Sequence, residues 1–273
     1  MDFNLFEQIL GQIKNRAQRV VFHLFGEPLL HPKIGEMIKM AKDHGLKTSL
    51  HTNASLLTEE KSVQILDSGL DILVFSFNGG EQRDDYERIS QVGAYDKVIQ
   101  NIRTFLKLKK VRRQKNPRAG FEVIKLFKPG HKFAVEEKFK RLFPDLPSKA
   151  FGGGWAHHWA GDFKETIKIG YTYPNFTYAP CQHLWNELAI CWDGTVIGCC
   201  NDVFRTFVLG DAKRESIERI WQCEKMYYLR QKLIDGEYKD LELCKNCDKL
   251  FADKNEKNIL KKLVKNVISK ALI

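Results

Sequence analysis

The chain has 273 residues, which is enough to bury a substantial core in one large domain, or in one domain followed by a smaller module. No apolar run approaches the roughly eighteen residues that span a bilayer, and residues 1–16 lack a signal-peptide pattern, so we expect a soluble, cytoplasmic protein. The net charge of +10 is concentrated in residues 107–115 and after residue 249. Charge in such segments is typical of solvated helix surfaces, so no nucleic-acid partner is expected.

The first half of the chain alternates between helical and strand patterns, which predicts β/α units around a parallel sheet. Helices are expected over 2–16, 32–43, the segment after Thr58, 94–110 and 134–143. Strands are expected over 19–25, 46–51, 71–77 and 119–126, with a fifth in the stretch 148–161. The strand at 71–77 is nearly all apolar, which predicts burial on both faces. Because ligands gather at the carboxyl ends of parallel strands, the loops after residues 25, 51, 77 and 126 should line one site.

The pattern changes after about residue 165. An aromatic loop leads to a hairpin around Asp193-Gly194, since Asp-Gly is a strong hairpin signal. A helix near 216–232 and a loop with Cys244 and Cys247 follow. This module is too small to bury much core, so we expect a metal centre to stabilise it.

All seven cysteines lie in the last third of the chain: Cys181, Cys191, Cys199, Cys200, Cys223, Cys244 and Cys247. Because a cytosolic C-x-x-C pair with further upstream cysteines binds metal more often than it forms disulfides, a metal site is expected. The pair Cys244 and Cys247, with Cys181 and Cys199 flanking the hairpin, supplies four thiolates. Both zinc and an iron–sulfur cluster accept four cysteines. Cys200 would point to the opposite strand face from Cys199, so one of these two is the expected ligand.

The same region resembles the SPASM or twitch domain of radical SAM proteins. The resemblance covers roughly residues 181–250: a C-x9-C-x2-Gly194-x4-Cys199 pattern, the Leu209-Gly210 step, a helix with Ile217, Ile220 and Trp221, and a late C-x2-C. It implies that Cys181, Cys199, Cys244 and Cys247 ligate an auxiliary four-iron four-sulfur cluster. Cys191 and Cys223 are then expected to be small buried residues.

The first half carries a matching resemblance. Gly26, Glu27 and Pro28, at the end of the first predicted strand, resemble the G-G-E-P motif that receives the amino group of S-adenosylmethionine (SAM), although Phe25 replaces its first glycine. A glycine there lets the backbone approach a ligand, and a carboxylate can pair with an ammonium. Further positions resemble those that contact SAM in the family: Asn53, Ser76, Asn78 and Arg88.

The implied fold is α/β: a partial, TIM-like (β/α)6 barrel lacking its first strand over residues 1–165, a SPASM or twitch domain with a β-hairpin over 166–250, and a C-terminal amphipathic helix over 251–273. Family members hold a second, catalytic cluster through C-x3-C-x2-C, and no cysteine precedes Cys181 here. We therefore expect either a fragment or a natural form that has lost this cluster. The chain alone is expected to be inactive.

The resemblance implies an oxidoreductase-type radical SAM enzyme that abstracts hydrogen from a peptide, a sugar or a similar small substrate, with an electron donor such as flavodoxin or ferredoxin. His157 and His158 are candidate acid or base groups. The tail helix is expected to pack on protein, with peripheral membrane contact as the alternative. The competing interpretation of the whole chain is a non-catalytic iron–sulfur or zinc scaffold.

Overall fold

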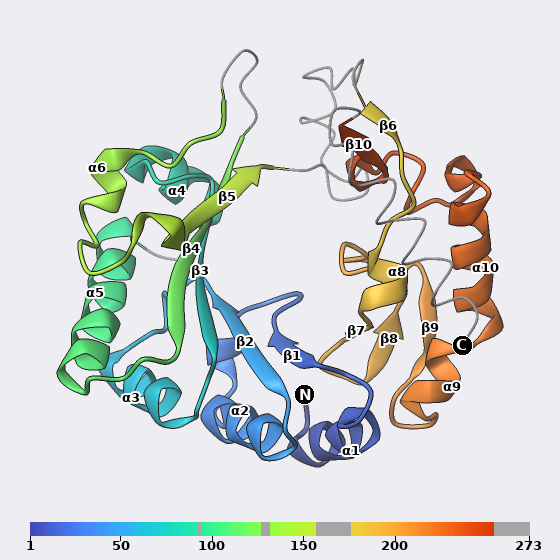
Figure 1. Cartoon of the computed structure of the whole chain (residues 1–273), viewed down its shortest axis with the longest axis horizontal. Coiled ribbons are helices and arrows are strands. Elements are labelled where there is room, and N and C mark those ends of the chain that lie inside the picture. The colour runs from blue at the N-terminus through green and yellow to red at the C-terminus, as the bar shows by residue number, and fades with distance from the viewer. Residues whose placement is uncertain (92–93, 127–131, 157–175, 254–273) are drawn as a thin grey trace. The chain divides into compact units, whose positions relative to one another are not determined.

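The computed structural model describes residues 1–91, 94–126, 132–156 and 176–253 (Figure 1). The chain forms two compact units. One is Phe6–Ala156, and the other joins Met1–Leu5 to the chain after Ala156. The boundary predicted near residue 165 lies outside the described residues, and the three predicted domain ranges stay predictions.

The unit Phe6–Ala156 is built on a five-stranded parallel sheet in the order β1-β2-β3-β4-β5. Its strands are β1 (Arg19–Phe22), β2 (Lys47–Thr52), β3 (Ile72–Asn78), β4 (Arg118–Lys125) and β5 (Phe151–Trp155). The four clear strands and the fifth one in the glycine-rich stretch are confirmed. The first strand is shorter than predicted, because the chain leaves the sheet after Phe22 and Leu24 takes a positive φ of 110°.

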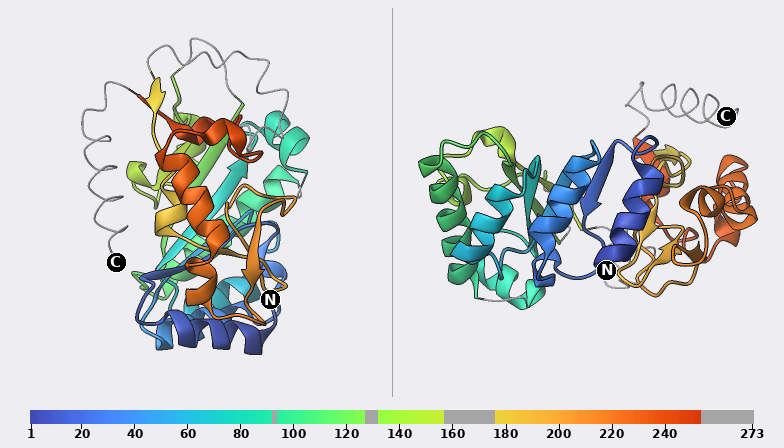
Figure 2. Two further views of the ribbon diagram at one scale, coloured as in Figure 1. Left: turned by 90° about the vertical axis from the view of Figure 1, so that its right-hand side faces the viewer. Right: turned by 90° about the horizontal axis from the view of Figure 1, so that it is seen from below.

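Helices follow the strands and line one face of the sheet (Figures 1 and 2). They are α1 (Phe3–Ile13), α2 (Ile34–Asp43), α3 (Glu59–Asp67), α4 (Arg83–Ser90), α5 (Tyr95–Val111) and α6 (Glu137–Lys140). The Thr58 hydroxyl caps α3 by accepting a hydrogen bond from the Lys61 amide at 3.2 Å, as the sequence predicts. Helix α4 was not predicted, because its residues are mostly charged and show little apolar periodicity.

The two faces of the sheet differ in burial. Leu73, Phe75 and Phe77 of β3 are fully buried under the helices, where Phe77 contacts Phe121 and Phe139 with ring centroids 5.5 and 5.1 Å apart. The alternate residues of β3 are only half-buried. The prediction that this strand is buried on both faces is therefore wrong. Its second face carries residues such as Ser76 and stays partly open.

The other unit contains two small antiparallel sheets. One pairs β6 (Phe176–Tyr178) with β10 (Phe251–Asp253), and the other has the order β7-β8-β9. The latter strands are β7 (Ala189–Ile190), β8 (Thr195–Ile197) and β9 (Val208–Asp211). The predicted hairpin is confirmed, since Gly194 turns between β7 and β8 with a φ of 94°.

Helices α8 (His183–Asn186), α9 (Ile217–Trp221) and α10 (Glu224–Ile234) complete this unit. The single helix predicted near 216–232 is wrong, because Cys223 is extended (φ −67°, ψ 155°) and separates α9 from α10. Side chains of Val196, Ile220 and Leu233 form its buried core.

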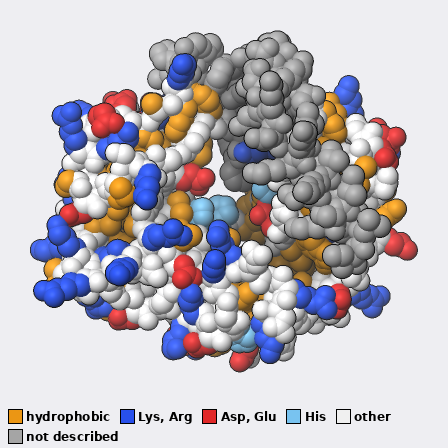
Figure 3. Space-filling view, in the orientation of Figure 1, with side chains coloured by type: hydrophobic (Ala, Val, Ile, Leu, Met, Phe, Trp, Pro, Cys, Tyr) orange, Lys and Arg blue, Asp and Glu red, His pale blue; other side chains and the backbone are white. Residues whose placement is uncertain are grey.

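The predicted fold class is confirmed: a parallel α/β sheet, consistent with a partial TIM-like barrel, precedes a small antiparallel region. Within the described ranges, no helix combines the length and the apolar character needed to cross a bilayer. The predicted tail helix lies outside them. On the face drawn in Figure 3, Lys and Arg side chains are spread among acidic ones.

Candidate functional site

The unit after Ala156 gathers five half-buried cysteines from three segments. Cys181 directly precedes α8, Cys199 and Cys200 follow β8, and Cys244 and Cys247 lie in turns ahead of β10. The last pair sits on one tight loop, in which the Cys247 amide donates to the Cys244 carbonyl at 2.9 Å. All seven cysteines of the chain are described, and all are free thiols. The fold thus brings together the four positions that the sequence singles out.

The pKa shifts of these thiols indicate that they interact electrostatically. Burial raises the pKa of Cys181 to about 11, and the nearby Cys199 adds to this effect. Burial likewise raises the pKa of Cys244 to about 12, with further contributions from Cys199, Cys247 and Cys181. Since thiolates rather than thiols bind metal, a cation placed among them would offset this mutual repulsion. The arrangement suits a positively charged centre.

Cys199 and Cys200 do not follow the strand alternation expected for them, because β8 ends at Ile197, before both residues. Their thiols lie within hydrogen-bonding reach of each other. A hydrogen bond from Cys200 and one from the Asn201 amide hold the pKa of Cys199 at about 7, while the same thiol contact and burial raise the pKa of Cys200. The Asn201 amide donates to Cys199 Sγ at 3.4 Å. Cys199 is therefore the better stabilised thiolate.

Cys200 belongs to a second group of potential ligands. Its sulfur and one ligand atom each of His183 and Glu187 lie within 4.8 Å of one another. Cys191 is buried, with 3% of its surface exposed, as expected for a small core residue. Cys223 is half-buried at the start of α10, and its thiol lies 3.9 Å from the Leu209 carbonyl.

In the unit Phe6–Ala156, Glu27 links the ends of two neighbouring strands. Its carboxylate accepts three hydrogen bonds: from the Leu29 amide at 3.0 Å, the Thr52 hydroxyl at 2.7 Å and the Asn53 amide at 2.9 Å. Gly26 precedes it with a positive φ of 100°. Pro28 begins the 3-10 helix η1 (Pro28–Leu30). The carboxylate thus holds the loops after β1 and β2 in place, a role that sequence reasoning did not assign to it.

The other predicted cofactor positions are distributed around the same strand ends. The Asn53 side-chain oxygen Oδ1 accepts a hydrogen bond from the Ser55 amide at 2.9 Å, which closes a turn after β2. Ser76 is half-buried, and Asn78 is exposed at the end of β3. Because they are two residues apart, these last two share the open face of the sheet. The ends of three neighbouring strands, β1, β2 and β3, therefore present polar groups at one edge of the sheet.

Arg88 is separated from this set. It lies on α4 with its side chain 61% exposed and pairs with Asp85 at 2.8 Å, as a helix-surface charge would. The chain turns from β3 toward α4 at Gly79, which has a φ of 100°. Only glycine fits there, because a Cβ atom would lie 2.8 Å from the Ile89 Cβ. His157 and His158 lie outside the described residues.

Sequence reasoning missed a polar group on the open face. His23 and His51 stand with ring centroids 4.8 Å apart, and His51 Nδ1 lies 3.6 Å from Glu122 Oε2. These three residues could have been found from the sequence, because each is a titratable residue among apolar neighbours in a predicted strand: VFHLF, SLHT and FEVIK.

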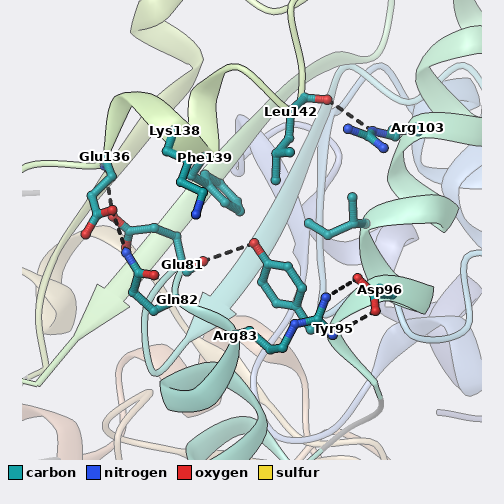
Figure 4. A pocket seen from close by; sticks show the side chains of 11 residues that line it. Glu81, Gln82, Arg83, Tyr95, Asp96, Arg103, Glu136, Lys138, Phe139 and Leu142 are labelled. Carbon is teal, nitrogen blue, oxygen red and sulfur yellow. Dashed lines mark hydrogen bonds and ion pairs between the residues drawn. The ribbon is translucent and has the colours of Figure 1, made fainter.

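A pocket of about 290 Å³ lies under α5 and α6, on the helix side of the sheet (Figure 4). Several of its polar groups already have partners. Arg83 pairs with Asp96, and Arg103 donates to the Leu142 carbonyl at 3.1 Å. The Tyr95 hydroxyl donates to the Glu81 carbonyl at 3.0 Å. None of the predicted site residues lines this pocket.

Two family models match the chain. The model of the radical SAM superfamily matches residues 1–113, and the model of SPASM, an iron–sulfur cluster-binding domain, matches residues 181–248. The second match contains every cysteine of the group described above.

Known relatives and solved structures agree with these matches. The cofactor-modifying protein of the tungsten-containing aldehyde ferredoxin oxidoreductase of Pyrococcus furiosus is 25% identical, over 84% of this chain and 75% of that protein. The S-adenosyl-L-methionine-dependent 2-deoxy-scyllo-inosamine dehydrogenase of Niallia circulans is 20% identical, over 94% of this chain and 84% of that protein.

The fold is also that of a solved structure, BtrN in complex with AdoMet and 2-DOIA. It aligns with a TM-score of 0.56 and 17% identity, over 91% of this chain and 80% of BtrN. Together the two family models match more than half of the chain. The chain therefore belongs to the radical SAM superfamily and carries a SPASM iron–sulfur cluster-binding domain.

Proposed function

We propose that this chain is an oxidoreductase-type radical SAM enzyme, or a fragment of one, with an auxiliary four-iron four-sulfur cluster bound by Cys181, Cys199, Cys244 and Cys247. The observation that carries the proposal is the convergence of these thiols, in which Cys244 interacts electrostatically with the other three. Four thiolates suit zinc as well as iron. The SPASM match favours the iron–sulfur cluster.

SAM is proposed to bind at the strand ends of the parallel sheet. The backbone at Gly26, Glu27 and Pro28 would face it, while the Glu27 carboxylate orients this loop against Asn53. The alternate residues Ser76 and Asn78 on β3 would complete the site. Arg88 is a weaker member, because its guanidinium pairs with Asp85 on the helix surface.

When SAM and the clusters are bound, such enzymes generate a radical that abstracts a hydrogen atom from the substrate, and a cluster can accept the remaining electron. We infer that this chain by itself does not cleave SAM, because no cysteine precedes Cys181 to hold a catalytic cluster. A flavodoxin or ferredoxin is the proposed electron donor. His157 and His158 stay candidate acid or base groups.

The proposed substrate is a peptide, a sugar or a similar small molecule. The Niallia circulans relative is named for 2-deoxy-scyllo-inosamine, a hydroxylated cyclic amine. Among these substrate classes, the polar side chains on the open face of the sheet favour a small hydroxylated substrate.

Anaerobic reconstitution with iron and sulfide tests the cluster assignment. The wild-type chain should bind about four irons and show brown absorbance. A Cys244→Ser, Cys247→Ser double variant should lose both signals, whereas Cys223→Ser, which removes a thiol outside the group, should keep them. Zinc binding without iron under these conditions would contradict the cluster.

The alternative function is a non-catalytic metal-binding scaffold built on the same cysteines. Formation of 5′-deoxyadenosine separates the two. With this chain alone, reductive cleavage of SAM should be undetectable. Cysteine-dependent cleavage would show that the inferred inactivity is wrong, and failure to bind SAM in a form that contains a C-x3-C-x2-C segment would favour the scaffold.

A further inference from the structure

Three strand segments place titratable side chains together on the open face of the parallel sheet. His23 follows β1, His51 lies on β2, and Glu122 lies on β4. Val74 of β3 and Gly120 of β4 occupy the same row as His51. Neither residue has a polar side chain. Glu122 lies two residues further along β4, opposite Ser76 in the strand register, and its side chain extends across β3 to the imidazole of His51.

The burial of this group sets it apart from ordinary surface polarity. The His51 side chain is 22% exposed, and its Nδ1 atom is buried without a hydrogen-bond partner, 3.6 Å from Glu122 Oε2. Glu122 is 46% exposed. A buried nitrogen beside a carboxylate is stabilised when it carries a proton, because the N–H can then point at the negative charge. His23 and Glu122 are the titratable groups that contact His51 in the described part of the chain.

This arrangement determines which ring nitrogen is available for chemistry. With the proton of neutral His51 on Nδ1, Nε2 carries a lone pair and acts as a proton acceptor. His51 and Glu122 therefore have the relationship of a general base and the residue that orients it.

We propose that His51 is the catalytic base that accepts the hydroxyl proton of a small hydroxylated substrate on the open face of the sheet, with Glu122 as its positioning residue. This inference rests on the proposed function, since it adds the proton acceptor to the oxidation of an alcohol. In the step, the substrate O–H bond breaks, both electrons stay on oxygen, and an N–H bond forms at Nε2. No oxidant is needed for the proton transfer itself.

Histidine ¹⁵N NMR of the full chain tests the positioning role without any cofactor. Neutral His51 should be the Nδ1–H tautomer in the wild-type chain and should become a mixture of tautomers in Glu122→Gln. Glu60→Gln is the matched control, because Glu60 is an exposed glutamate on α3. A dominant Nε2–H tautomer in the wild-type chain, or no change in Glu122→Gln, would overturn the proposal.

Binding of 2-deoxy-scyllo-inosamine, followed by calorimetry, tests the contact with substrate. His51→Gln should weaken binding about tenfold, the loss expected for one hydrogen bond to a partly buried group, and Glu60→Gln should leave it unchanged. No binding, or equal binding by His51→Gln, would contradict the assignment.

The two proposals fail in different ways. A chain that assembles the cluster but shows neither the tautomer change nor binding of this amine refutes only the role of His51. Failure to assemble an iron–sulfur cluster refutes the proposed function whatever the histidine signals show.

Discussion

The Thr52 hydroxyl donates a hydrogen bond to the Glu27 carboxylate at 2.7 Å and accepts one from the Ala54 amide at 3.0 Å. Thr52 is 1% exposed, so its hydroxyl connects the loops after β1 and β2 inside the protein. Both loops carry residues of the proposed SAM site. This single side chain therefore couples the shape of the site to the stability of the sheet.

Replacing Thr52 by Val should destabilise the protein by about 1–3 kcal/mol, because the buried Ala54 amide loses its acceptor and the half-buried Glu27 carboxylate loses one donor. Urea unfolding measures the loss. Thr104→Val is the control, since the Thr104 hydroxyl accepts only a long bond of 3.5 Å from Gln100. Equal effects of the two substitutions would show that the hydroxyl of Thr52 contributes little.

Cys199 and Cys200 should differ in their effect on the auxiliary cluster. Cys199→Ser should abolish iron binding, because the Asn201 amide stabilises the Cys199 sulfur and Cys244 and Cys181 surround it. Cys200→Ser should retain most of the iron. Iron content and absorbance after anaerobic reconstitution give the comparison, and the reverse order would exchange the ligand assignment.

The buried ion pair between Glu81 and Lys125 should be important for stability. Lys125 Nζ lies 2.6 Å from Glu81 Oε1, and the two side chains are 19% and 1% exposed. Lys125→Met should cost about 3–5 kcal/mol of unfolding free energy, because it leaves a buried carboxylate without its counter-charge. The control is Lys140→Met, which removes an ion pair to the 72%-exposed Glu137 and should change stability by less than about 1 kcal/mol.

Asp193 should make the stability of the hairpin depend on acid pH. Partial burial raises the pKa of its carboxyl, but the Thr195 amide and the Arg205 guanidinium outweigh this effect and hold the pKa at about 2. An unfolded aspartate has a pKa of about 3.9. The stabilisation is therefore complete above about pH 4 and is lost as the pH falls toward 2.

The measurement compares the wild-type chain with Asp193→Asn across this range. The difference in unfolding free energy should be largest near neutral pH and should shrink between about pH 4 and 2. A difference that stays constant with pH would mean that the charge of Asp193 does not contribute to the hairpin.

The order of strands and helices in the first half could be predicted because its signals are local. The cap at Thr58 and the apolar strand segments depend only on neighbouring residues. Helix α4 escaped prediction because charged residues dominate it. At Cys223 the opposite error occurred, and one helix was predicted where there are two. The helical pattern of 216–232 contains no signal for the extended residue that separates α9 from α10.

The motifs along the chain carry the family resemblance. Periodicity and residue spacing were enough to predict the parallel α/β sheet, the small antiparallel module and the set of cysteines, because these signals are local. The contacts between distant residues come from the tertiary fold. It placed three donors on the Glu27 carboxylate, set Cys199 and Cys200 beyond the end of β8, and left one face of the sheet open, with His51 beside Glu122. The Thr52–Glu27 hydrogen bond and the His51–Glu122 contact join residues 25 and 71 positions apart. The pairing of strands, which no local pattern specifies, brings these residues into contact.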